Sequence, residues 1–159
     1  MADLFTHVLV AYTIGISLSW RFNWITPPYI TGLMVGSTLP DLTRVGLILR
    51  PTQIEAVLGI PFSWTPLHLG IGVLISVLIL SSFLSGQSAK RISLLLGVGA
   101  VSHLILDSLL RSASGYLYAV FWPLSSQNII GPGLYLSSDM LPAVIAVAVA
   151  FVIWRIDKS

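Results

Sequence analysis

The chain has 159 residues, of which 55% are hydrophobic and only 9% carry a charge. A soluble domain usually carries about 25% charged residues, so this composition excludes an ordinary soluble protein and predicts a single integral membrane domain over residues 1–159. The formal net charge of +2 comes without a run of basic residues, so no nucleic-acid partner is expected. The absence of cysteine excludes disulfides and thiolate chemistry.

The predicted fold is an all-α, polytopic membrane helix bundle with about five transmembrane segments. Apolar stretches close to the ~20 residues that span a bilayer alternate with proline, glycine or charged residues. Pro40 is expected to kink or end the second stretch, because proline removes a backbone donor and disfavours helix at the preceding residue. Thr65 and Pro66 predict a capped start for the third. In chain order, the stretches cover residues 4–20, about 29–50, 66–84, 92–110 and about 140–154.

Two connecting stretches have a character of their own. Residues 50–65 form an amphipathic connector, and residues 112–137 form a loop rich in serine, glycine, proline and aromatic residues. Within that loop, residues 118–122 are apolar but too short to span a bilayer, so they are expected to lie in the interface or to re-enter the membrane. No positively charged region precedes the first apolar stretch, so no cleaved signal peptide is expected.

Counting the crossings places all three histidines on one side of the membrane, called the histidine side here. Five of the six acidic residues fall on the same side: Asp3, Asp41, Glu55, Asp107 and Asp139. The opposite side has more basic residues, with Arg21, Lys90, Arg91, Arg155 and Lys158 against Arg44, Arg50 and Arg111. The positive-inside rule then predicts a plasma-membrane protein with the N-terminus and the histidine side outside and the C-terminus in the cytoplasm.

The polar residues of the histidine side are typical of a metal site. His103 and Asp107 are four residues apart, as are Asp3 and His7, and this spacing puts each pair on one helix face. Imidazole and carboxylate are ligands of zinc, manganese and non-haem iron, and zinc is the ion expected first. The predicted ligands are Asp3, His7, Asp41, His68, His103 and Asp107. Of these, Asp41, His103 and Asp107 are the predicted catalytic residues.

Simpler interpretations exist for single members of this set. Asp3 and Asp139 each stand at a helix start, where a carboxylate stabilises the helix dipole. His103 and Asp107 can also form a satisfied, buried hydrogen-bonded pair. The metal hypothesis therefore rests on the whole set, because an ionisable residue inside a spanning helix is costly and marks a functional site.

Two arginines of the histidine side, Arg44 and Arg111, are predicted to hold an anionic group of the substrate. At the depth of the headgroups that group is a lipid phosphate, which makes membrane lipid the expected partner. The leading hypothesis is metal-dependent hydrolysis of a phospholipid or lipid-linked phosphoester. A metal-ion or proton-coupled transporter or channel is the first alternative, and a structural membrane protein with a metal-stabilised core is the second. The sequence does not predict an oligomeric state.

An ordered set of short motifs resembles a known family. The set consists of Thr6-His7, Leu39-Pro40-Asp41, Ser102-His103-Leu104-Ile105-Leu106-Asp107, Gly115 and Trp122-Pro123. It is similar to the LexA-binding, inner-membrane-associated, metal-dependent hydrolases, and it looks like a compact, archaeal version of them. The resemblance implies a helical membrane fold with metal ligands in these motifs. Thr43 replaces a second aspartate that the family often has, and one histidine is missing around His68, so one metal ion is as well supported as two.

Overall fold

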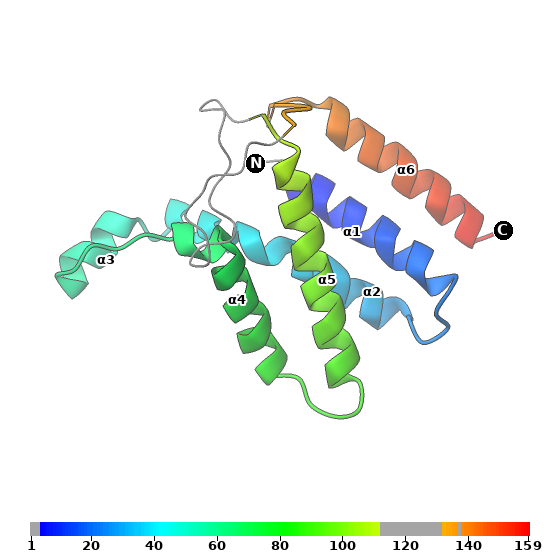
Figure 1. Cartoon of the computed structure of the whole chain (residues 1–159), viewed down its shortest axis with the longest axis horizontal. Helices are drawn as coiled ribbons and strands as arrows, with labels where there is room; N and C mark the ends of the chain where they lie inside the picture. The colour runs from blue at the N-terminus through cyan, green and yellow to red at the C-terminus, as the bar shows by residue number, and fades with distance from the viewer. Residues whose placement is uncertain (1–3, 112–131, 137) are drawn as a thin grey trace.

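The computed structural model describes residues 4–111, 132–136 and 138–159 (Figure 1). The regular elements of this part of the chain are all helices, which confirms the predicted all-α class. It also contains one isolated backbone bridge, between Leu110 and Tyr135. The elements are α1 (Leu4–Ser19), α2 (Pro27–Thr38), η1 (Leu39–Leu47), α3 (Pro51–Leu58), η2 (Thr65–His68), α4 (Gly70–Ser82), α5 (Ala89–Ser108) and α6 (Leu141–Asp157), where η denotes a 3₁₀ helix.

Proline and one extended residue break the predicted segments. The second segment changes at Thr38 from α-helix to the 3₁₀ helix η1, as Pro40 predicts. The third segment was expected as one helix from Pro66, and this is wrong. Leu69 is extended, with φ −80° and ψ 153°, so η2 stands as a separate turn and α4 begins at Gly70.

The described helices are shorter than the predicted transmembrane segments. Only α5, with 20 residues, is long and apolar enough among the described helices to cross a membrane. The apolar helices α1 and α4 have 16 and 13 residues. The expectation of about five spanning segments is therefore wrong for the described residues. Two features shorten the helices. The 3₁₀ helix η1 replaces the second half of the second predicted segment, and the break at Leu69 shortens the third.

The crossing of α2 and α5 forms the centre of the bundle (Figure 1). Gly36 and Gly99 lie at this crossing, and a Cβ atom on either would clash with a backbone carbonyl of the other helix. Helix α1 packs on α2, and α6 packs along α1 in the same direction. The indole Nε1 of Trp20 donates to Asp157 at 3.1 Å, which ties the carboxyl ends of α1 and α6 together.

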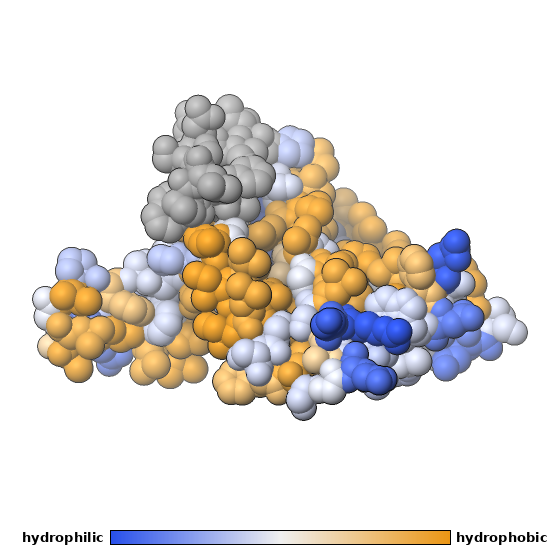
Figure 2. All heavy atoms as spheres, turned by 60° about the horizontal axis from the view of Figure 1, so that its bottom comes forward, coloured by the Kyte–Doolittle hydropathy of each residue, from blue (hydrophilic) through white to orange (hydrophobic). Residues whose placement is uncertain are grey.

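Much of the molecular surface is apolar. In Figure 2, hydrophobic residues cover wide areas, and strongly hydrophilic residues gather in a small part of that face. Large apolar side chains are exposed along α4 and α6, including Leu78, Ile79, Val144, Phe151 and Val152. A monomeric soluble protein rarely exposes continuous apolar patches of this extent, so the surface suits a lipid environment.

Candidate metal centre

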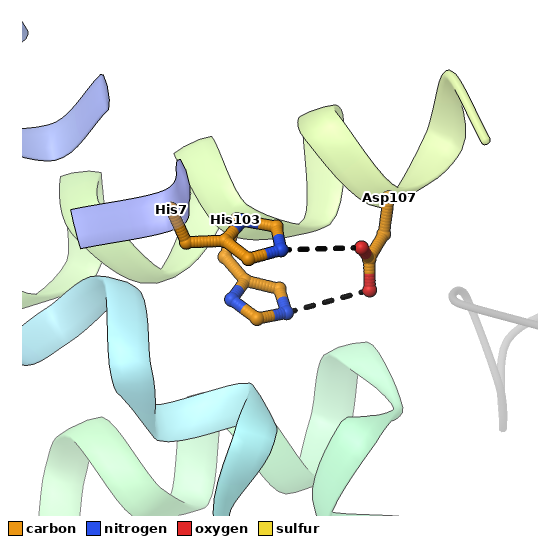
Figure 3. Close-up of side chains that lie close together, drawn as sticks. All are labelled: His7, His103 and Asp107. Atoms are coloured by element: carbon orange, nitrogen blue, oxygen red, sulfur yellow. Dashed lines mark ion pairs between the residues drawn. The ribbon is translucent and has the colours of Figure 1, made fainter. Parts of the chain in front are cut away.

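Three histidines from three elements surround one carboxylate. His7 comes from α1, His68 from η2, and His103 and Asp107 from α5. The Nε2 atoms lie 3.3 Å (His7), 2.9 Å (His68) and 3.4 Å (His103) from the nearer oxygen of Asp107. Figure 3 shows the contacts of His7 and His103 with the two carboxylate oxygens. All four residues are buried, and both His7 and His103 are fully inaccessible.

Backbone carbonyls fix the orientation of two of the imidazoles. The Nδ1 atom of His103 donates to the carbonyl of Ser37 at 2.7 Å, and the Nδ1 atom of His68 donates to the carbonyl of Pro40 at 3.0 Å. A neutral imidazole with a proton on Nδ1 has a lone pair on Nε2. Both lone pairs then face the negative Asp107, which is repulsive unless a cation or a proton lies between them. Backbone carbonyls that accept a hydrogen bond from the other ring nitrogen orient metal-binding histidines in this way.

Protons alone do not balance the cluster. Burial lowers the pKa of His68, but its hydrogen bonds to Asp107 and to the Pro40 carbonyl outweigh burial and hold the pKa above its ordinary value. A proton there satisfies one of the three Nε2 contacts. The rings of His7 and His103 stack with centroids 3.6 Å apart and planes 11° apart, so two imidazolium charges on them would repel strongly.

Several buried polar atoms of the cluster have no hydrogen-bond partner among the described residues. They are both ring nitrogens of His7, Nε2 of His103, Oδ1 of Asp107 and both carboxylate oxygens of Asp41. Buried polar groups without partners are rare, and each one calls for a missing counterpart. A divalent cation would meet several of these atoms at once, so the donor set fits a metal ion.

Asp41 adds a second carboxylate to the centre. Asp41, His68 and His103 offer ligand atoms within 4.8 Å of one another, and so do His7, His103 and Asp107. The two groups share His103. The Nη2 atom of Arg44 lies 3.0 Å from Oδ2 of Asp41, without hydrogen-bond geometry, and the Arg44 side chain is 43% exposed. One ion or two adjacent ions are both compatible with this arrangement.

Close helix packing and two short turns build the centre. The absence of side chains at Gly36 and Gly99 lets α2 and α5 approach until Ser37 meets His103. The turn at Pro40 then presents Asp41 to the cluster and a carbonyl to His68. Helix α4 starts so close to η2 that a Cβ on Gly72 would clash with the Pro66 carbonyl.

The structure brings together five of the six predicted metal ligands, and the sixth, Asp3, lies outside the described residues. Arg44 reaches the cluster through Asp41. Arg111 is exposed, its backbone N–H donates to Tyr135, and no contact with the cluster is seen in the described part of the chain. The predicted interfacial segment at residues 118–122 also lies outside it.

The remaining acidic residues of the histidine side have local roles. Glu55 accepts a hydrogen bond from the backbone N–H of Phe62, and Asp139 accepts one from Leu136 just before α6. This contact lies before α6, whose N-cap is Met140 and whose first turn has no acidic residue, so the helix-start interpretation of Asp139 stays a prediction. The contacts of the Ser37 and Pro40 carbonyls with the histidines were not predicted from the sequence. The available signals were Gly36, which allows a close approach of another helix, and Pro40, which breaks the helix there.

Comparison with known proteins gives one family. No curated protein and no solved structure matches the chain. Residues 1–158 match the family described as YdjM inner membrane protein. This agrees with the apolar surface and with the predicted membrane location. Because the match covers nearly the whole sequence, the chain belongs to the YdjM inner membrane protein family.

Proposed function

We propose that this inner membrane protein binds a divalent metal ion, zinc in the first place, and hydrolyses a phosphoester of a membrane lipid. The convergence of three histidine Nε2 atoms on Asp107, two of them oriented by backbone carbonyls, carries the proposal. Either group of three ligands matches catalytic zinc sites, which use three protein ligands and leave the fourth position open. Manganese and iron accept the same ligands.

The side chains around the centre have distinct tasks in this proposal. A divalent ion held by one of the two ligand groups would supply Lewis acidity and lower the pKa of a water molecule. With the ion on His7, His103 and Asp107, Asp41 would be the proton acceptor, since neither of its buried oxygens has a hydrogen-bond partner among the described residues. Arg44 beside it is half exposed and holds the anionic phosphoryl group, which a guanidinium binds through two parallel hydrogen bonds. His103 and Asp107 would themselves be ligands of the ion.

A polar pocket next to the centre supports a small polar headgroup as part of the substrate. The pocket has a volume of about 280 Å³ and includes His68 in its wall. Its wall also contains the hydroxyl groups of Thr43, Ser63 and Thr65, while the indole Nε1 of Trp64 donates to the Leu49 carbonyl. Thr43 stands where the resembling hydrolases often have a second aspartate, and here it contributes to the pocket.

The distribution of buried polar residues favours a hydrolase over a transporter. In the described part of the chain, the buried polar side chains are Thr6, His7, Ser37, Asp41, His68, Ser102, His103 and Asp107. All of them belong to the end of the bundle that holds the centre. A transport path needs polar groups that continue toward the opposite end, and the buried residues there, such as Ile25 and Ile30, are apolar.

Metal removal tests the proposal. Protein purified in detergent is expected to hold at least one zinc, manganese or iron ion per chain by elemental analysis and to hydrolyse phosphatidic acid or phosphatidylglycerol. A chelator is expected to abolish this hydrolysis, and the metal alone to restore it. The Arg44→Ala variant tests the substrate contact separately from metal binding. It is expected to retain the metal ion and to raise KM more than it lowers kcat.

Other results would favour the alternatives. Metal uptake into liposomes would support a transporter. A bound ion with four protein ligands and no exchangeable water would support a structural centre.

We propose further that the N-terminus and the metal centre face the outside and that the C-terminus lies in the cytoplasm. The basic residues Arg21, Lys90, Arg91, Arg155 and Lys158 stand at the end of the bundle away from the centre, which supports this orientation. A single cysteine at Ala2 is expected to react with a membrane-impermeant thiol reagent in intact cells, and a cysteine at Ser159 only after lysis. The reverse labelling pattern would invert the orientation.

A further inference from the structure

An apolar groove runs along the bundle toward the end that holds the metal centre. It lies between α4 and α5, which stand side by side and antiparallel in Figure 1, and its volume is about 540 Å³. At one end its wall contains Gly70, two residues after His68, and Ser108, next to Asp107. At the other end it contains Val77 and Gly97. Between these ends the wall is apolar: Val73, Leu74, Ala100, Val101, Leu104 and Ile105.

The dimensions and position of the groove favour one flexible hydrocarbon chain. At 1.5 Å per residue, the groove is ~10 Å long on α4 and ~16 Å long on α5. Its wall includes the small residues Gly70, Gly97 and Ala100, which make room for a thin occupant. The polar pocket at Thr43, Ser63 and Thr65 borders the same centre through His68. An amphiphile with its head in the pocket and its chain in the groove would present the bond between them to the centre.

We infer that the groove binds an acyl chain of the lipid substrate and thereby sets the chain-length preference of the site. The inference rests on the proposed function for the headgroup end, whereas the groove itself is independent of metal binding. It assigns α4 a role beyond packing, since Leu74 and Val77 would contact substrate. An inner membrane protein meets such chains at its apolar surface, so no separate carrier is needed.

Photo-crosslinking of the full-length protein in detergent tests the inference. The probe is dodecyl phosphate with a diazirine at the end of its chain. Crosslinks are expected near Val77 and Gly97, and a probe with the diazirine beside the phosphate is expected to label residues near Gly70 and Ser108. Hexadecyl phosphate, whose chain exceeds the groove, is expected to compete less well than dodecyl phosphate.

Two variants narrow the groove, and one leaves it unchanged. Gly97→Phe fills open space, because a Cβ on Gly97 has no neighbour within 4 Å, and it is expected to reduce groove crosslinking about tenfold. Gly97 also lines a shallower groove between α1 and α5. Leu74 lines only the groove between α4 and α5, so Leu74→Trp shows whether an effect of Gly97→Phe comes from that groove. Ile75→Phe is the matched control on α4: it is 48% exposed against 52% for Leu74 and lies outside the groove.

Each outcome of this experiment is distinct. Crosslinks spread evenly over the exposed residues of α6, or unchanged in Leu74→Trp, would overturn the inference. So would a dimer in detergent that buries the groove against a second copy. Groove crosslinks in a protein without metal or hydrolysis would refute the proposed function but not the chain site. Full metal content and hydrolysis without groove crosslinks would refute the chain site alone.

Discussion

Asp107→Asn is expected to lower the affinity for zinc by about 100-fold. The loss of a group that only hydrogen-bonds to a metal ligand already costs about 10- to 100-fold. All three histidines contact Asp107 at 2.9–3.4 Å, so its charge contributes to every ligand position. Asparagine keeps the size of the side chain and removes the charge. The measurement is a zinc titration of metal-stripped protein. Asp157→Ala, at the far end of α6, is the control and is expected to bind zinc normally.

The same variant separates a metal centre from a satisfied histidine–aspartate network. Without metal, the asparagine amide donates hydrogen bonds to the Nε2 lone pairs that the Asp107 carboxylate repels. Metal-free Asp107→Asn is therefore expected to denature at the same temperature as the metal-free wild type or higher. If the cluster is a proton-linked network without metal, the substitution removes the acceptor of those protons. It would then lower the denaturation temperature and leave the metal content of the purified protein unchanged.

The convergence of ligands was predictable because it depends on the order and direction of the helices. His7 near the start of α1, His68 before α4, and His103 near the end of α5 lie at the same end of the bundle whenever successive helices alternate in direction. The helix break at Pro40 was also predictable, because the missing backbone N–H of proline disrupts the helix at its own position. These features follow from residue types and chain order alone.

The geometry within the centre was not predictable in the same way. The extended backbone of Leu69 separates η2 from α4, yet nothing in Thr65-Pro66-Leu67-His68 distinguishes it from a capped helix start. The predicted lengths of the membrane helices were wrong for the same reason, because such backbone breaks leave no signal in the sequence. The carbonyls that orient His68 and His103 belong to distant residues and depend on how closely α2 and α5 approach. Hydropathy does not predict that distance. Gly36 and Gly99 explain it only once it is known that each faces the backbone of the other helix.

The packing of α2 against α5 leads to the second large effect. Gly99→Ala is expected to destabilise the protein and to weaken zinc binding together. The added Cβ would clash with the Leu33 carbonyl and come within 2.8 Å of the Ser37 backbone nitrogen. Backbone atoms do not rotate away, so α2 and α5 must separate. Ser37 then moves away from His103, and the 2.7 Å hydrogen bond that orients this imidazole lengthens.

Gly97→Ala is the matched control for this substitution. Both glycines lie inside α5 two residues apart, and alanine favours a helix over glycine by about 0.5–1 kcal/mol at either position. At Gly97 the new Cβ meets no atom within 4 Å, so Gly97→Ala is expected to raise the denaturation temperature slightly and to keep zinc affinity. At Gly99 overpacking costs about 1–3 kcal/mol and outweighs the helix gain. Thermal denaturation in detergent and zinc titration of both variants measure the difference. Equal stability and equal affinity in the two variants would mean that the α2–α5 contact does not position the centre.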